Sequence, residues 1–263
     1  RELLNAIFHR LSIKKIIFVV HHLVMDGVSW RILLEDLSSV YLSLLEGKLP
    51  KLLNTSNYKT WSKQLSTAAN SNFIKNDIEY WLEFSDKLSQ LEWEADTIIQ
   101  NSVAEIETIT GKLSANKIIS RIYQLVNKKN IKINEILLSV LVFVLYKLNG
   151  KYQIRLDLEG HGREECIEGV NVSRTIGWFT SIYPILFTLP KESSQLDFNS
   201  LFLIIAKQVK ETLRTVPNNG VGFSILKYLS NNSEIRNKLS SLNESEIIFN
   251  YLGDFTEKPN EKN

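Results

Sequence analysis

A short apolar run stands directly before a polar turn and a long amphipathic stretch, and this order restricts the fold more than any other feature. Residues 15–20 are mostly β-branched or aromatic, which predicts a strand buried on both faces. Asp26-Gly27 predicts a turn in which Gly27 adopts a positive φ, with Ser29 as the cap of the next helix. Apolar residues then recur every three or four positions until Gly47, so the chain contains a strand–turn–helix unit with one helix face directed inward.

The remaining periodicities predict further helices and strands in a mixed order. Residues 2–11 have the spacing of the end of a helix, and residues 92–102 are polar enough to connect two lobes. The other helices are expected at residues 58–69, 74–88, 115–128, from a cap at Asn134 to 148, and 198–213. Strands are expected at residues 103–110, 152–159, 182–189 and 246–252, with Pro184 near a strand start or in an edge strand.

The composition excludes several classes of protein. Hydrophobic residues make up 44% of the 263 positions, which is enough for a substantial core. The formal net charge is +2 and the lysines are scattered, so a nucleic-acid partner is not expected. Cys166 is the single cysteine, which excludes an internal disulfide and favours a reducing cytoplasmic setting. The longest apolar stretch, residues 136–146, is too short for a membrane span.

The pair His21-His22 follows the predicted buried strand and is the first candidate for chemistry. Neighbouring strand residues point to opposite faces, so the two imidazoles are poorly arranged to share a metal ion. Either histidine could also be a core residue with satisfied hydrogen bonds. However, a strand that ends in histidine before a helix N-terminus can deliver an imidazole to a site, where it can act as a general acid or base.

The residues around this pair resemble a known family. Residues 21–27 read H-H-x-x-x-D-G, which resembles the signature of the condensation-domain superfamily of nonribosomal peptide synthetases, similar in fold to chloramphenicol acetyltransferase. The continuation at residues 28–31 and four later stretches resemble the epimerization branch of that superfamily. These stretches are Glu-Gly-His-Gly-Arg-Glu at residues 159–164, Arg-Thr-Ile-Gly-Trp-Phe-Thr-Ser-Ile-Tyr-Pro at 174–184, Val-Pro-Asn-Asn-Gly-Val-Gly-Phe at 216–223 and Phe-Asn-Tyr-Leu-Gly at 249–253.

The resemblance implies an α/β (α+β) fold with two lobes, each a mixed sheet flanked by helices. Residues 1–91 would form the C-terminal part of the first lobe and residues 92–263 the second lobe, with most of the first lobe upstream of Arg1. The implied activity is epimerization of an L-aminoacyl or L-peptidyl thioester on the phosphopantetheine arm of an upstream peptidyl carrier protein, next to other synthetase modules. The arm belongs to the partner, so no cofactor and no metal of the chain's own are implied.

The same resemblance assigns roles to residues. His22 and Glu159 would be the acid/base pair, and which of them removes the L-side proton is left open. Tyr251 is a third catalytic candidate, either as a proton donor or as an orienting hydroxyl, and is equally compatible with packing in a strand. A condensation domain that forms amide bonds remains an alternative, but it has no need of the Glu159 carboxylate. A carrier-binding fragment without activity is a second alternative.

Four further residues are expected to be structural at the site: His21, Asp26, Gly27 and Arg163. In this superfamily the motif aspartate pairs with an arginine that holds the histidine loop, and Arg163 is the matching arginine. The main-chain N–H groups after Gly27 are candidates to stabilise an enolate oxygen. His161 is expected to make a loop hydrogen bond. Whether Trp30, Trp178 and Phe179 line the channel or pack in the core is left open.

Overall fold

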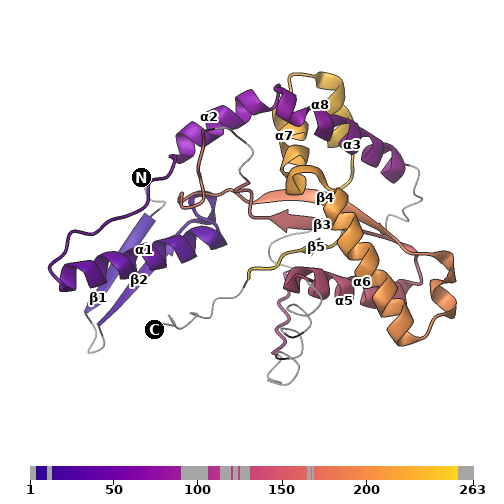
Figure 1. The fold of residues 1–263 in the computed structure, drawn as a ribbon, viewed down its shortest axis with the longest axis horizontal. Helices are drawn as coiled ribbons and strands as arrows, with labels where there is room; N and C mark the ends of the chain where they lie inside the picture. Colours follow the sequence, from indigo (N-terminus) through magenta and orange to yellow (C-terminus); the bar gives the residue numbers. More distant parts are fainter. Residues whose placement is uncertain are drawn as a thin grey trace. The chain divides into compact units, whose positions relative to one another are not determined.

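The computed structural model describes residues 4–10, 14–89, 106–112, 120, 124, 131–164, 167 and 169–253. Its elements are β1 (Leu4–Arg10), β2 (Lys14–Val20), the 3-10 helix η1 (His22–Val24), α1 (Gly27–Leu45), α2 (Tyr58–Ala68), α3 (Asn72–Ser89), α5 (Ile133–Asn149), β3 (Gln153–Gly160), β4 (Ser181–Thr188), η3 (Lys191–Gln195), α6 (Phe198–Thr215), η4 (Pro217–Gly220), α7 (Val221–Leu229), α8 (Ser233–Ser240) and β5 (Ile248–Phe249). Figure 1 labels most of them along the chain.

Two sheets are present in the described part of the chain. The first is the antiparallel pair of β1 and β2, in which Leu4 lies opposite Val20 and Arg10 opposite Lys14. The second has the order β4-β3-β5, with β5 parallel to β3 through the pairs Asp157–Ile248 and Leu158–Phe249 (Figure 1). Pro184 lies in β4, an edge strand of this sheet, as predicted.

The described chain divides into two compact units. Unit 1 contains residues 1–82, 156–185 and 216–263, and unit 2 contains residues 83–155 and 186–215. In unit 1, Trp81 is fully buried and its ring lies 5.0 Å from that of Phe223. In unit 2, α5 packs against α6, with the rings of Phe143 and Phe198 4.9 Å apart. The predicted lobe boundary between residues 91 and 92 lies outside the described residues and stays a prediction.

Most of the predicted helices are present at the expected positions, including α2, α3, α5 and α6. Helix α1 is followed at Gly47 by a left-handed residue with φ +67°, as its sequence predicts. The N-terminal cap of α1 is Asp26 rather than Ser29, because the Asp26 carboxylate accepts the N–H of Ser29. The N-cap of α5 is Lys132 rather than Asn134, and the Lys132 N–H donates to the Glu135 carboxylate at 2.9 Å.

Several other predictions are wrong. Residues 4–10 form strand β1 and not a helix, because they pair along their whole length with β2. Residues 106–110 are irregular rather than a strand. Gly27 does not have a positive φ, because it is the first residue of helix α1. The strand expected at residues 246–252 is limited to Ile248–Phe249. The expected connection at residues 92–102 and most of the expected helix at 115–128 lie outside the described residues.

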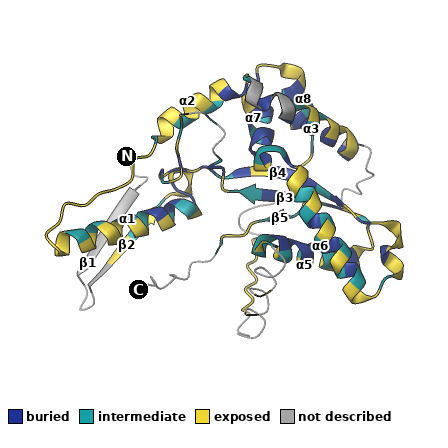
Figure 2. Cartoon of the chain, viewed as in Figure 1, coloured by how far each residue is buried: buried dark blue, intermediate teal, exposed yellow. Residues whose placement is uncertain are grey.

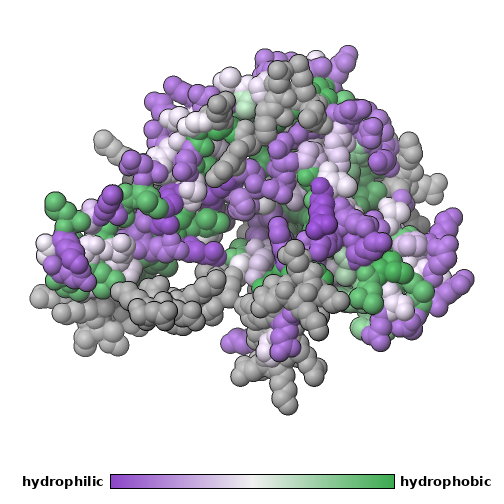
Figure 3. Space-filling model, viewed as in Figure 1, coloured by the Kyte–Doolittle hydropathy of each residue, from purple (hydrophilic) through white to green (hydrophobic). Residues whose placement is uncertain are grey.

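Burial is concentrated away from α1 and β2. Strands β3 and β4 and helix α7 are largely buried, whereas α1 is mostly exposed (Figure 2). Ile17 on β2 is 49% exposed, so this strand is not buried on both faces as predicted; the described sheet that contains it has only two strands. Apolar surface is visible among hydrophilic side chains in the region of α1 (Figure 3). The exposed apolar residues of α1 are Leu34, Leu37, Tyr41, Leu42, Leu44 and Leu45.

Candidate functional site

The site begins where the histidine turn ends and α1 starts. Asp26 has an extended backbone, with φ −95° and ψ 178°, and its carboxylate accepts the N–H of Ser29 at 2.8 Å. This is the standard arrangement of an aspartate N-cap, in which a side-chain oxygen satisfies an N–H that the helix cannot. The helix start therefore fixes the position of a carboxylate four residues after His22.

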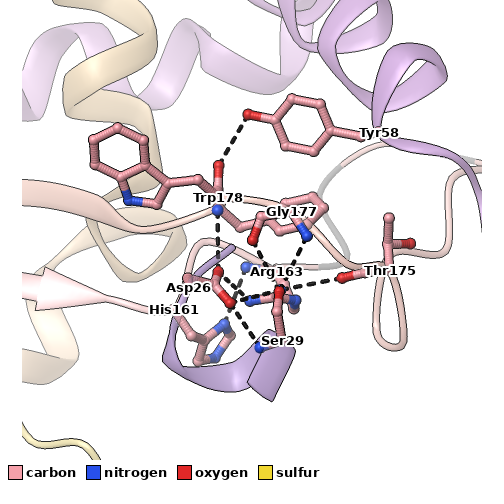
Figure 4. Close-up of polar contacts among 9 residues, drawn as sticks. Asp26, Ser29, Tyr58, His161, Arg163, Thr175, Gly177 and Trp178 are labelled. Carbon is pink, nitrogen blue, oxygen red and sulfur yellow. Dashed lines mark hydrogen bonds and ion pairs between the residues drawn. The ribbon is translucent and has the colours of Figure 1, made fainter. Parts of the chain in front are cut away.

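Arg163 forms a bidentate ion pair with Asp26, so the structure brings together the two residues that the sequence paired. The Nη1–Oδ2 distance is 2.6 Å and the Nη2–Oδ1 distance is 3.0 Å (Figure 4). The two side chains are only 4% and 3% exposed. Arg163 Nη2 also donates to Ser29 Oγ at 2.9 Å and to the Thr175 carbonyl at 3.1 Å, so both terminal nitrogens of the guanidinium are hydrogen-bonded.

The buried ion pair keeps Asp26 ionised. Burial alone raises the pKa of a carboxyl group, but here hydrogen bonds from Arg163 and from the N–H groups of Ser29 and Phe179 outweigh it. The pKa of Asp26 therefore lies below its ordinary value of 3.8. The Arg163 guanidinium also lies over the ring of Phe179, 4.2 Å from its centroid.

A strap formed by residues 175–179 crosses the start of α1. The Gly177 carbonyl accepts the N–H of Asp26 at 3.1 Å and the hydroxyl of Ser29 at 2.9 Å, while the Gly177 N–H donates to the same hydroxyl at 3.0 Å. The Phe179 N–H donates to Asp26 Oδ2 at 3.1 Å. A Cβ at position 177 would lie 2.4 Å from the Tyr58 ring, so glycine is needed for this close approach.

The two histidines of the turn have different surroundings. His21 precedes η1, and its Nδ1 accepts the N–H of Leu23 at 3.1 Å. His22 is the first residue of η1 and is exposed, and its imidazole lies beside the indole of Trp178 in a tilted arrangement, with ring centroids 5.6 Å apart. His21 therefore stabilises the turn, and His22 presents its imidazole beside an aromatic ring.

Glu159 lies near the end of β3, where the register with β5 determines its neighbour. Leu158 pairs with Phe249, so the next residues along the two parallel strands are Glu159 and Asn250. The Glu159 carboxylate accepts a hydrogen bond from the Asn250 side-chain amide. Tyr251 follows directly and is 36% exposed. Glu159 is half-buried as a residue, and its carboxylate is held by an amide partner that the sequence reasoning did not name.

The loop after β3 connects Glu159 with the ion pair. Gly162 has a φ of +64°, and a Cβ there would lie 1.6 Å from the Phe179 carbonyl oxygen. His161 Nδ1 accepts the N–H of Arg163 at 3.0 Å, which is the loop hydrogen bond that was expected. A left-handed turn at this glycine therefore places Arg163 against Asp26 only four residues after Glu159.

The segment after β5 lies against the start of α1. The carbonyl oxygen of Leu252 is 3.5 Å from Arg31 Nη2, and a Cβ built at Gly27 would be 3.9 Å from the Leu252 side chain. Tyr251 therefore belongs to a segment that contacts the helix following His22. Among the described residues, no hydrogen bond joins His22 to Glu159, so their acid/base pairing stays a prediction.

The described residues contain neither a group of potential metal ligands nor a helix that could span a membrane. No group of three or more His, Cys, Asp or Glu side chains in the described ranges is placed to hold a metal ion. None of the helices in those ranges is long and apolar enough to cross a membrane.

Comparison with known sequences defines the class of protein. A sequence model of the condensation domain matches residues 6–263, so the chain belongs to the condensation-domain family. One of the linear gramicidin synthase proteins of Brevibacillus parabrevis is 38% identical over 258 residues, which cover 95% of this chain and 3% of that protein. Gramicidin S synthase 1 of Brevibacillus brevis is 36% identical over 254 residues, which cover 95% of this chain and 22% of that protein. The predicted superfamily is thereby confirmed, and the chain spans a small part of each relative.

Solved structures confirm the predicted α/β fold class. The epimerization domain from the third module of tyrocidine synthetase B is 32% identical, with a TM-score of 0.74, covering 92% of this chain and 54% of that one. The first condensation domain of the CDA synthetase is 14% identical, with a TM-score of 0.58, covering 82% of this chain and 45% of that one. The chain thus spans about half the length of each, and the second likeness shows the fold alone.

Proposed function

We propose that this chain is part of an epimerization domain of a nonribosomal peptide synthetase. The substrate would be an L-aminoacyl or L-peptidyl thioester on the phosphopantetheine arm of a carrier protein. The observation that carries the proposal is the carboxylate of the half-buried residue Glu159 near the end of β3, held by Asn250, which directly precedes Tyr251. The greater similarity to the tyrocidine synthetase epimerization domain than to the CDA condensation domain supports it.

The reaction would proceed by removal and return of the Cα proton. One of His22 and Glu159 takes the proton from Cα, and the electron pair of the broken C–H bond moves into the thioester carbonyl to form an enolate. The other group then gives a proton to the opposite face of Cα, and the electron pair returns from the oxygen. General acid–base catalysis of this kind needs two proton-transfer groups that reach Cα from opposite sides.

The enolate oxygen would need a donor or a positive field. The N-terminus of α1 begins at Gly27, and its first N–H groups carry the positive end of the helix dipole. The Asp26 carboxylate at this helix end is neutralised by Arg163, which limits its repulsion of a second negative charge. Tyr251 would orient the substrate or donate a proton from the neighbouring segment.

The test is deuterium exchange at Cα. A carrier protein loaded with an L-aminoacyl thioester is mixed, in heavy water, with the full-length polypeptide that carries this chain, and both Cα exchange and chirality are followed. Exchange together with D-product supports the proposal. An amide formed with a second loaded carrier would indicate a condensation domain instead, and carrier binding without either reaction would indicate an inactive binding fragment.

Glu159→Gln separates epimerization from the other two activities further. Glutamine can still accept a hydrogen bond from the Asn250 amide, but it cannot take a proton. We expect exchange to slow by roughly 100- to 10,000-fold. The matched control is Glu164→Gln in the same loop, since Glu164 binds the Asn219 amide at 2.9 Å. This control should retain most of the rate. A Glu159→Gln variant with nearly the same rate as the control would remove Glu159 from the mechanism.

A further inference from the structure

We propose that Trp178 is a positioning residue for His22: its indole holds the imidazole in one orientation and stabilises it when it carries a proton. The inference rests on the proposed function, because it assigns to Trp178 a task in the reaction of His22. Sequence reasoning left open whether this tryptophan lines a channel or packs in the core. The structure shows that it is 40% exposed, whereas the adjacent Phe179 is 3% exposed, so the two aromatics differ in environment.

The first argument is the way in which the histidines of this site are held. Nδ1 of His21 accepts the Leu23 N–H, and Nδ1 of His161 accepts the Arg163 N–H, so each of these imidazoles is oriented by the main chain. Among the described residues, no hydrogen bond reaches the imidazole of His22. Its ring contact is with Trp178, at a centroid distance of 5.6 Å and an interplanar angle of 55°. Trp178 is therefore the described aromatic side chain that is placed to orient this imidazole.

The second argument is that the backbone of Trp178 is fixed on both sides. Gly177 is bonded to Asp26 and Ser29, and the N–H of Phe179 donates to the Asp26 carboxylate. The carbonyl oxygen of Trp178 itself accepts the hydroxyl of Tyr58 at 2.9 Å. In Figure 4 the indole extends away from this cluster of polar contacts, while the main chain of the strap lies within it.

The third argument concerns the common support of the two rings. Asp26 caps the helix that follows the His22 turn and also accepts the N–H of Phe179 in the strap. The imidazole and the indole therefore extend from two segments that are bonded to the same carboxylate. This shared carboxylate fixes the two segments relative to each other, and precise placement of a reacting group is a large part of catalysis.

The chemistry gives this contact a use. When His22 holds the proton removed from Cα, or the proton about to be returned, its imidazole is a cation. An aromatic ring within about 6 Å of a cation attracts it through the ring quadrupole. Trp178 would thus stabilise the charged form in the orientation that faces the substrate.

The variants are Trp178→Phe and Trp178→Ala, with Trp61→Ala as the matched control. The Trp61 ring packs 4.7 Å from Phe179 in the same aromatic cluster, but it has no described ring contact with His22. In the full-length polypeptide with its loaded carrier, we expect Trp178→Ala to lower kcat for Cα exchange by roughly 10- to 100-fold with KM little changed. Trp178→Phe should recover most of kcat, and Trp61→Ala should have the smaller effect.

A second measurement does not depend on activity. Diethyl pyrocarbonate acylates neutral imidazole, and peptide mass spectrometry reports the modification of His22 relative to that of His161. Since the indole lies beside the His22 ring, its removal should open that side of the ring to the reagent. Trp178→Ala should therefore speed acylation of His22 without changing His161, and Trp61→Ala should change neither. An unchanged His22 rate in Trp178→Ala overturns the inference.

The outcomes distinguish the two proposals. A wild-type protein that does not exchange Cα–H would refute epimerization. The acylation of His22 relative to His161 would still test whether Trp178 contacts His22. If the wild type exchanges Cα–H and Trp178→Ala keeps its kcat, the positioning role of Trp178 is refuted while the proposed function is not. An equal loss of kcat in Trp61→Ala and Trp178→Ala also refutes it, because the loss would then come from packing of the strap.

Discussion

Replacing Asp26 by alanine should destabilise the fold far more than removing an exposed carboxylate. The Asp26 carboxylate accepts four hydrogen bonds, two from Arg163 and one each from the N–H groups of Ser29 and Phe179. Loss of the helix cap alone costs about 1 kcal/mol. Leaving one partner of a buried ion pair without its counter-charge costs roughly 3 to 5 kcal/mol, so with the loss of the cap we expect a total of roughly 4 to 6 kcal/mol for Asp26→Ala.

The control is Asp36→Ala, which removes the same side chain from an ion pair with Arg174. In that pair the side chains are 30% and 24% exposed, so water already screens the charges. Such pairs contribute about 0 to 1 kcal/mol. Both variants are compared with the wild-type protein by urea unfolding, in which the midpoint should fall much further for Asp26→Ala while the slope stays constant.

The pH dependence supplies a second measurement on the same variant. The pKa of Asp26 is lower in the folded protein than its ordinary value of 3.8. The stability that this shift contributes is therefore fully present above about pH 4 and is lost as the pH falls through the lowered folded pKa. Asp26→Ala should lack this acid-induced loss. The reasoning is refuted if Asp26→Ala and Asp36→Ala unfold at the same urea concentration.

Two further predictions concern single positions in unit 1. Gly162→Ala should destabilise the protein much more than Gly47→Ala, although both glycines have a left-handed φ. At Gly47 nothing lies within 4 Å of the new Cβ, so the variant has only the backbone strain, about 1 to 2 kcal/mol. At Gly162 the new Cβ would also meet the Phe179 carbonyl. Equal thermal midpoints of the two variants would contradict this prediction. Asp77 is 1% exposed, and burial, partly offset by the Asn218 amide, raises its pKa. Ionisation of Asp77 thus opposes folding above its raised pKa, so Asp77→Asn should raise Tm near neutral pH, and the gain should shrink as the pH is lowered toward 3.8.

The parts of the fold that follow local periodicity were predictable. Helix α1 has apolar residues at helical spacing and ends before Gly47, and the apolar run before it forms β2. The spacing of residues 4–10 failed as a guide because Leu4, Ile7 and Phe8 fit a helix, yet pairing with the adjacent β2 satisfies the main chain equally well. A pattern of this length fits both a helix and a strand, and pairing with the neighbouring strand β2 determines which of them forms.

The cap of α1 shows why part of the site lay beyond sequence reasoning. Asp26 and Ser29 are both good N-caps, and they stand three residues apart, so that either residue suits the pattern. The structure selects Asp26 because the Ser29 hydroxyl is occupied by Gly177, which is 148 residues away. No periodicity relates two such positions. The sequence could name the aspartate and its arginine through a family resemblance, but it could not show that a strap shares the same carboxylate.

The glycines of the motifs explain how these distant segments come so close. At Gly162 a Cβ would overlap the Phe179 carbonyl, and at Gly177 it would overlap the ring of Tyr58. Gly162 allows a close approach to backbone and Gly177 a close approach to an aromatic ring, and both glycines lie next to residues that bond or pair with Asp26. The two glycines therefore let the loop that carries Arg163 and the strap at residues 175–179 approach closely where the ion pair is buried. Because Gly177 and Phe179 in the strap bond to Asp26 and Ser29, the stability of the helix start is coupled to the position of the strap that carries Trp178.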